Sequence, residues 1–93
     1  MAGGMQGGDP EDMDRVAGVI DAEREQIEGT RDELQSRVDA LIPNIWNGPD
    51  ADAFVGNFNS DIRPQFDAVI EEMQQSAEEL RRNADEQRTT SAQ

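Results

Sequence analysis

A strict seven-residue repeat of apolar side chains restricts the fold of this chain more than any other feature. The repeat occupies the first half of the sequence, at Met13, Ile20, Ile27, Leu34 and Leu41. Apolar residues at this spacing form a stripe along one face of an α-helix that packs against another helix. The repeat therefore predicts a long first helix, from about residue 9 to residue 42.

The ends of this helix are marked by residues with strong positional preferences. Asp9 is a good N-cap, and Pro10 suits the first helical position because its missing N–H has no partner there in any case. Pro43 disfavours helical geometry at Ile42, so we expect the helix to stop near Leu41.

Two features inside this helix leave alternatives open. Gly18 and Gly29 each cost roughly 1 kcal/mol relative to Ala in a helix interior, unless they allow a second helix to approach closely. Glu23, Thr30 and Arg37 recur beside the apolar stripe. They either tune register and partner choice, or lie at the edge of the stripe with their stems over apolar neighbours.

A second helix is predicted from about residue 49. Pro49 fits the first helical position, and Asp50 and Asp52 suit the positive end of the helix dipole. Pro64 removes one backbone donor from the interior and should kink the helix near Ser60. Apolar residues recur at helical steps along this segment, at Phe54, Val55, Phe58, Ile62, Phe66, Val69, Met73, Ala77, Leu80 and Ala84.

Two long helices joined by a short connection must run antiparallel. The predicted fold class is therefore all-α, an antiparallel helix-turn-helix hairpin with its turn at residues 43–48. A turn centred near Trp46 pairs Leu34 with Phe58, Ile27 with Phe66, Ile20 with Met73, and Met13 with Leu80. The residues expected to pack in the hairpin or in a dimer are Met13, Ile20, Ile27, Leu34, Leu41, Phe54, Phe58, Ile62, Phe66, Val69, Met73 and Leu80.

The hairpin is expected to form one domain over residues 9–84. Residues 1–8 contain four Gly and should be a flexible lead-in. Residues 85–93 have nothing to pack on in the predicted register and should form a loose tail. Because one partner helix cannot cover all the Phe and Ile side chains, we expect two hairpins to dimerise into a four-helix bundle.

Composition excludes several classes of function. The chain has no Cys and no His, which removes thiolate metal sites and the commonest general base. Its formal net charge of −13 repels DNA, RNA and anionic membranes. Paired carboxylates such as Glu71 and Glu72 flank the apolar line, where a solvated helix face is the better interpretation than acid–base catalysis. We expect no enzyme, no metal, no cofactor and no membrane insertion.

The single Trp of the chain lies in the predicted turn, where Trp46 is followed by Gly48. Two interpretations remain open. The ring can close the end of the hairpin core while the glycine permits a tight turn. Alternatively, the two residues form a recognition site. The Met and Phe stripe of the second helix has the same ambiguity between core and binding groove.

Trp46-Asn47-Gly48, midway along a chain of 93 residues with two amphipathic helices, resembles the WXG100 (ESAT-6-like) family. The resemblance extends from about Asp9 onward. It implies a hairpin that assembles with itself or with a WXG100-like partner and is exported as a folded dimer by a type VII (ESX-type) secretion system. It also implies contact with the secretion ATPase, with Trp46 and Gly48 as part of the export signal.

The second part of that signal departs from the family. Many exported members carry a Tyr and, four residues later, an acid beyond the second helix, whereas this chain has no Tyr. Gln87 and Ser91 stand at those positions. The N-terminus lacks the basic and apolar regions of a signal peptide, so the resemblance implies a protein that is cytoplasmic before export and then secreted without one. The alternative is a cytosolic helical adaptor or targeting chaperone for a larger secreted toxin-like partner.

Overall fold

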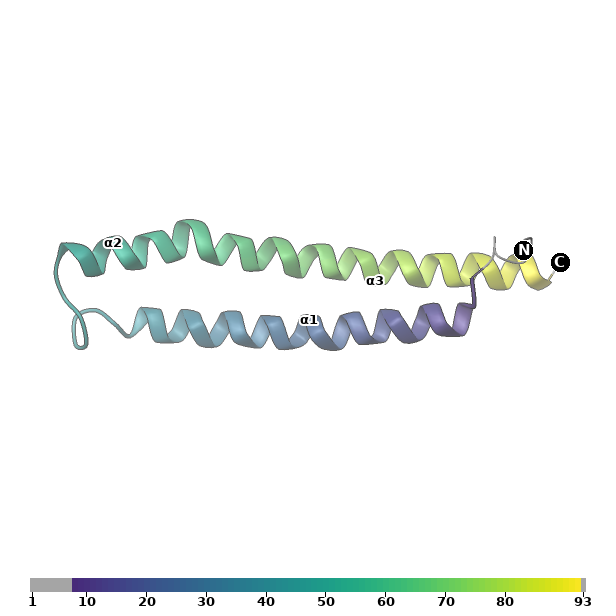
Figure 1. The fold of residues 1–93 in the computed structure, drawn as a ribbon, viewed down its shortest axis with the longest axis horizontal. Helices are drawn as coiled ribbons and strands as arrows, with labels where there is room; N and C mark the ends of the chain where they lie inside the picture. Colours follow the sequence, from purple (N-terminus) through teal and green to yellow (C-terminus); the bar gives the residue numbers. More distant parts are fainter. Residues whose placement is uncertain (1–7, 93) are drawn as a thin grey trace. The chain divides into compact units, whose positions relative to one another are not determined.

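The computed structural model describes residues 8–92, with the side chains of residues 91 and 92 left out. The helical elements in this range are α1 (Pro10–Asp39), α2 (Pro49–Asn57), the π-helix η2 (Phe58–Ile62) and α3 (Arg63–Ala92). No strand occurs between residues 8 and 92. The predicted all-α class is confirmed, because α2, η2 and α3 follow one another directly and form a hairpin with α1 (Figure 1).

The chain divides into two compact units, which we call the terminal unit and the turn unit. The terminal unit comprises Met1–Arg24 and Glu72–Gln93, and the turn unit comprises Glu25–Glu71. Each unit contains one segment of α1 and one segment of α3. The turn unit also contains α2, η2 and the connection between α1 and α2.

Helix α1 begins as the sequence predicts. The Oδ1 atom of Asp9 accepts a hydrogen bond from the backbone N–H of Glu11 at 3.0 Å. The carbonyl of Asp9 accepts the N–H of Met13 at 2.9 Å, and Pro10 is the first helical residue. Asp9 therefore satisfies N–H groups of the first turn that would otherwise have no partner inside the helix.

Helix α1 ends at Asp39, before the predicted end near residue 42. Hydrogen-bonded turns continue after it, since Leu41 donates its N–H to the carbonyl of Val38 at 3.1 Å. The chain then runs beyond the end of α1 and loops before α2 begins (Figure 1). This connection is longer and less symmetric than a turn centred on Trp46.

The disruption expected from Pro64 takes the form of the π-helix η2 directly before it. Pro64 cannot donate a hydrogen bond to the carbonyl of Ser60, and the N–H of Arg63 reaches back five residues to the carbonyl of Phe58. Phe58 and Ile70 are both buried although they lie twelve residues apart. Because a regular α-helix returns to nearly the same face after about eleven residues, the extra residue of the π turn keeps both side chains on the packing side.

The side chains least exposed to solvent define where the helices pack within each unit. In the turn unit they are Val38, Ala51, Phe58 and Ile70. In the terminal unit they are Ala17, Ala77 and Ala84, each 0% exposed. The sequence analysis named Phe58 among the packing residues but did not place the alanines at the centre of the contact.

The apolar seven-residue repeat of α1 does not coincide with the buried residues of this helix. The buried residues of α1 are Ala17 and Val38, and Arg24 and Arg31 lie between them at the same seven-residue spacing, with side chains 18% and 19% exposed. Leu34 is 37% exposed and the other members of the predicted stripe are half-buried. The packing of this stripe in a hairpin or a dimer therefore stays a prediction, and the arginine stems add apolar contact beside it.

The predicted register holds in only one of the two units. In the turn unit, Ile27 and Phe66 line the same groove, as predicted. In the terminal unit, Asp14 pairs with Arg88, which lies further along α3 than the Leu80 expected opposite Met13. The connection and η2 do not account for this offset by themselves, because both precede Phe66, which keeps its predicted partner.

The predicted loose tail is helical in the structure. Helix α3 continues to Ala92, Ala84 is fully buried, and Arg88 pairs with Asp14. The register error explains the difference, because the residues beyond 84 do have a partner segment in α1. The flexible lead-in predicted for residues 1–8 lies outside the described residues apart from Gly8, and so does Gln93.

Candidate functional site

Backbone hydrogen bonds fix the segment that carries the single Trp. The N–H groups of Ile45 and Trp46 both donate to the carbonyl of Leu41, each at 2.9 Å. These bonds satisfy one of the free carbonyls that follow a helix end. Trp46 is therefore held at a defined place directly after the turns that end α1.

Gly48 has a backbone conformation that favours glycine. Its φ is 121° and its ψ is 179°, on the side of conformational space that residues with a Cβ rarely occupy. Its carbonyl accepts the N–H of Asp52 at 3.0 Å, and its N–H donates to Oδ1 of Asn47 at 3.1 Å. Nothing lies within 4 Å of a Cβ built on Gly48, so its φ, rather than lack of space, is the reason for glycine. The residue thus redirects the chain so that Pro49 can begin α2.

The indole of Trp46 rests on the first ring of α2. The ring centroids of Trp46 and Phe54 are 5.7 Å apart, with an interplanar angle of 50°, a tilted arrangement that aromatic pairs favour. Trp46 remains 41% exposed, Phe54 47% and the neighbouring Ile45 73%. The Trp is thus positioned by packing on one side and presented to solvent on the other. Both interpretations of the sequence, end of core and recognition site, are compatible with this arrangement and stay predictions.

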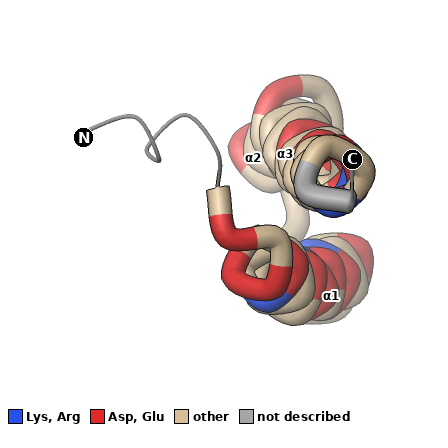
Figure 2. Tube along the Cα trace, turned by 90° about the vertical axis from the view of Figure 1, so that its right-hand side faces the viewer, with Lys and Arg blue, Asp and Glu red and all other residues tan. Residues whose placement is uncertain are grey.

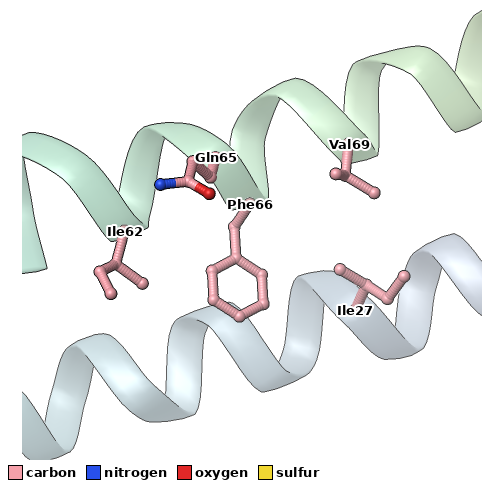
Figure 3. A pocket seen from close by; sticks show the side chains of 5 residues that line it. All are labelled: Ile27, Ile62, Gln65, Phe66 and Val69. Atoms are coloured by element: carbon pink, nitrogen blue, oxygen red, sulfur yellow. The ribbon is translucent and has the colours of Figure 1, made fainter.

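An open apolar groove lies in the turn unit beside the packing seam. It has a volume of about 310 Å³ and is lined by Ile27, Ile62, Gln65, Phe66 and Val69. The Phe66 ring extends from α3 toward α1 and lies beside Ile27 (Figure 3). Ile62 and Val69 are 38% and 46% exposed, so the side of the seam that carries this groove is not covered within the chain. We call it the apolar flank.

The other side of the seam is polar, and we call it the polar flank. On α1, Ile27 lies four residues before Arg31 and Gln35 lies four residues after it. Around the helix axis, these two residues therefore lie about 40° to either side of Arg31. Arg31 donates to Oδ1 of Asp67 at 2.9 Å, and Gln35 accepts from Nη1 of Arg63 at 3.0 Å. Hydrogen bonds from its guanidinium to Asp32 and Asp67 raise the pKa of Arg31. Cross-helix hydrogen bonds therefore close this flank.

The terminal unit repeats the polar flank with aspartate–arginine pairs. Nη2 of Arg81 lies 2.7 Å from Oδ2 of Asp21, and Arg88 pairs with Asp14. The hydrogen bond from Arg81 lowers the pKa of Asp21, and the bond to Asp14 raises the pKa of Arg88. Acidic positions recur along both α1 and α3, with the basic ones set among them (Figure 2). These pairs hold part of the strongly negative charge next to arginines.

The structure brings some of the predicted site residues together and separates others. Trp46 and Gly48 lie in the turn unit, two residues apart in a defined turn. Gln87 is half-buried on α3 in the terminal unit, and Ser91 is in the last described turn of α3. The four residues therefore do not form one site inside either unit. Glu23, Thr30 and Arg37 are exposed, as expected of residues at the edge of the stripe.

Sequence reasoning missed two parts of this region. It did not single out Ile45, the most exposed of the large apolar side chains among residues 8–90. The position of Ile45 directly before Trp46 was the available signal. It also missed the cross-helix bonds of Arg31, Gln35 and Arg63, because polar residues at helical spacing predict a solvated face until the seam is known.

None of the helices described between residues 8 and 92 has the length and apolar content needed to cross a membrane. In the same range, no group of three or more Asp and Glu side chains is arranged to hold a metal ion.

Comparison with known families gives one match. The model of the WXG100 family, described as proteins of 100 residues with WXG, matches residues 8–90. That range includes the turn of Trp46 and Gly48, both long helices and the position of Gln87. Comparisons with curated proteins and with solved structures found no match.

Proposed function

The chain belongs to the WXG100 family, and from this membership we propose that it is a small, non-enzymatic substrate of a type VII (ESX-type) secretion system. Members of this family are in general secreted by that route and are not enzymes. On this proposal, the chain leaves the cell as a folded helical dimer, and the turn that carries Trp46 and Gly48 is part of its export signal.

The observation that carries the proposal is the geometry of the turn. Trp46 is fixed through its N–H to Leu41 and through its ring to Phe54, yet it is 41% exposed. A large ring held rigidly and left open to solvent is the arrangement of an interface anchor, because little conformational entropy is lost when a partner covers it. The left-handed φ of Gly48 sets the direction of α2 that brings Phe54 to the indole.

The two flanks of the seam support the dimeric part of the proposal. The polar flank is closed by cross-helix hydrogen bonds, and the apolar flank leaves Ile62 and Val69 exposed around the groove. A second hairpin that covers the apolar flank completes a four-helix bundle. The partner is a second copy of this chain or a similar hairpin.

The end of α3 supplies the second part of the proposed signal. Gln87 and Ser91 occupy the positions at which many exported members carry a Tyr and an acid. We propose that these residues, or the tail of a partner hairpin, act together with Trp46 and Gly48 at the secretion ATPase.

A comparison of two alanine variants tests the export signal. Trp46→Ala should remove most of the chain from the culture medium while its level inside the cells is unchanged. Val19→Ala is the matched control, because Val19 is 51% exposed and lies in the terminal unit. Export of Trp46→Ala at the level of Val19→Ala, with the helical content of both intact, would rule out the signal role of the Trp.

The same assay separates secretion from the adaptor function. A secretion substrate accumulates in the medium, whereas an adaptor remains in the cells while a larger partner is exported. Retention of the unaltered chain in a strain that secretes such a partner would favour the adaptor and contradict the proposal.

A pair of charge insertions tests the dimer interface. Val69→Glu places a carboxylate in the groove, and Ala68→Glu places it on the neighbouring exposed position of the same helix. Burial of an unpaired charge should weaken the dimer by tenfold or more for Val69→Glu alone, roughly 1.4 kcal/mol or more. Light scattering on both variants measures this, and equal masses at equal concentration would remove the apolar flank as the interface.

A further inference from the structure

The connection between α1 and α2, together with the start of α2, exposes large apolar side chains to solvent. Ile45, Trp46 and Phe54 are 73%, 41% and 47% exposed, and we call them the turn patch. Phe54 packs on the indole of Trp46 with one face only. The side chain of Ile45 is largely exposed, and its backbone N–H makes the bond to Leu41.

The charges around the turn patch are of one sign. No basic residue occurs between Arg37 and Arg63, whereas four acids lie in this stretch; we call the three nearest the connection in the sequence, Asp39, Asp50 and Asp52, the turn acids. None of them forms an ion pair with an arginine of the chain, and all eight arginines lie within the described residues.

Outside residues 38–62, arginines are set among the acids and pair with some of them. Each of seven arginines forms an ion pair with an acid of its own chain: Arg15, Arg24, Arg31, Arg37, Arg63, Arg81 and Arg88. The preference of Asp50 and Asp52 for the positive end of α2 explains their place in the first turn. It does not explain Asp39, which lies at the end of α1 where the helix dipole disfavours an acid.

We propose that the turn patch and the turn acids form one docking surface, whose occupant is a partner protein that presents an apolar pocket edged by arginine or lysine. The inference rests on the proposed function in that it describes the chemistry of the partner that recognises the Trp46 turn. The exposed rings supply the anchors, and the unpaired acids supply complementarity and steer the encounter.

Charge decides between this partner and other occupants. A second copy of the chain carries a net charge of −13, and its arginines are largely engaged by its own acids. An anionic membrane is repelled by the negative charge of the chain. A basic protein surface gains attraction from acids that form no ion pair with an arginine of the chain, although Asp39 accepts a hydrogen bond from Gln35 at 2.9 Å.

The position of the single Trp provides a direct measurement. Trp46 emission should shift to shorter wavelength when the full chain is titrated with an amphipathic helical peptide of Leu and Arg. A Leu and Glu peptide of the same pattern and an Arg and Ser peptide without apolar residues should give no shift. Binding of the Leu and Arg peptide should weaken as salt is raised, since the acids are exposed.

Charge variants isolate the turn acids from the overall charge. The Kd for the Leu and Arg peptide should rise roughly three- to tenfold in the double variant Asp50→Asn/Asp52→Asn. Glu71→Gln/Glu72→Gln removes the same two charges from exposed positions on α3 and should change the Kd less than twofold. Asp39→Asn should also weaken binding, because it removes a turn acid. It should not lower stability, because this acid opposes the dipole of α1.

Several results would overturn the proposal. Equal losses in the two double variants would mean that only net charge matters, and equal binding of the Leu and Glu peptide would mean that only apolar character matters. A larger shift with phosphatidylcholine vesicles than with the peptide would identify a membrane as the occupant, and a shift with protein concentration alone would identify a second copy. Because no export step is involved, a failure here is distinct from a failure of the Trp46→Ala secretion assay.

Discussion

The turn unit and the terminal unit pack their helices with different side chains. The turn unit buries Val38, Ala51, Phe58 and Ile70, of which three are large. The terminal unit buries Ala17, Ala77 and Ala84, which have no side-chain volume beyond one methyl group. Large residues in the seam leave apolar surface at its edge, and there the groove of Ile27 and Phe66 is found. Alanine allows close approach of the backbones, and arginines then reach acids across the seam.

The two units should therefore be destabilised by opposite kinds of substitution. Where a seam depends on large side chains, truncation removes buried area and leaves a cavity. Where it depends on small ones, enlargement forces the helices apart.

Truncation of the buried ring in the turn unit should have the largest effect. Phe58 is 6% exposed, and Phe58→Ala should lower the free energy of unfolding by about 3–4 kcal/mol. Phe54→Ala is the control, because Phe54 is 47% exposed, and it should cost far less. Urea unfolding followed by circular dichroism at one protein concentration measures both. Equal losses of unfolding free energy in the two variants would show that burial of the Phe58 ring does not stabilise the turn unit.

Enlargement should be the sensitive change in the terminal unit. Ala77 is 0% exposed, so Ala77→Leu should cost about 1–3 kcal/mol through overpacking. Ala22→Leu, on an exposed position of α1 in the same unit, should be close to neutral. The same unfolding measurement applies. A neutral Ala77→Leu would mean that the helices of the terminal unit are not in close contact through alanine.

The glycines provide a smaller effect of predictable sign. Nothing lies within 4 Å of a Cβ built on Gly18 or Gly29, so close approach within the chain does not explain them. Gly29→Ala and Gly18→Ala should each raise the free energy of unfolding by about 0.5–1 kcal/mol. Gly48→Ala should lower it by about 1–2 kcal/mol, because its φ is 121°. A loss for Gly18→Ala or Gly29→Ala instead would place a partner helix against that glycine in the assembly.

The exposed ion pairs should give the smallest effect, and it should depend on pH. Arg81 lowers the pKa of Asp21 in the folded chain below its ordinary value of 3.8. The pair therefore contributes stability above that pH, and the contribution is lost as pH falls through the lowered pKa. Asp21→Asn should have a slightly lower melting temperature than the unaltered chain at pH 7 and the same one near pH 2. A difference that persists at pH 2 would assign it to packing rather than to charge.

The sequence was sufficient to predict the helices. It was not sufficient to predict which faces of the helices are in contact. Asp9, Pro10 and Pro49 act locally, through hydrogen bonds and fixed φ, and the helices begin at these signals. The seam depends on which side of each helix meets the other. The apolar repeat pointed to one side, while Arg24 and Arg31, which look exposed in the sequence, occupy the seam itself. The end of α1 at Asp39 and the five-residue π turn also depart from what the local signals specify.

The candidate site, too, could be predicted only in part from the sequence. Trp46 and Gly48 could be singled out because each is unusual at a turn, and the φ of Gly48 confirms that a glycine is needed there. The stacking of Phe54 on the indole and the exposure of Ile45 depend on the path of residues 40–48. That path is held by the backbone bonds to Leu41 and by the φ of Gly48, which the residue types alone do not specify.

The central claim is that type VII secretion exports this chain, and one measurement tests it most directly. The chain is expressed in a strain with an active type VII secretion ATPase and in the same strain with that ATPase inactivated, and the amount in the culture medium is compared. The account predicts the chain in the medium only when the ATPase is active, with a cytosolic marker absent from both media. Equal amounts in the two media, or none in either while the cells contain the folded chain, would contradict it.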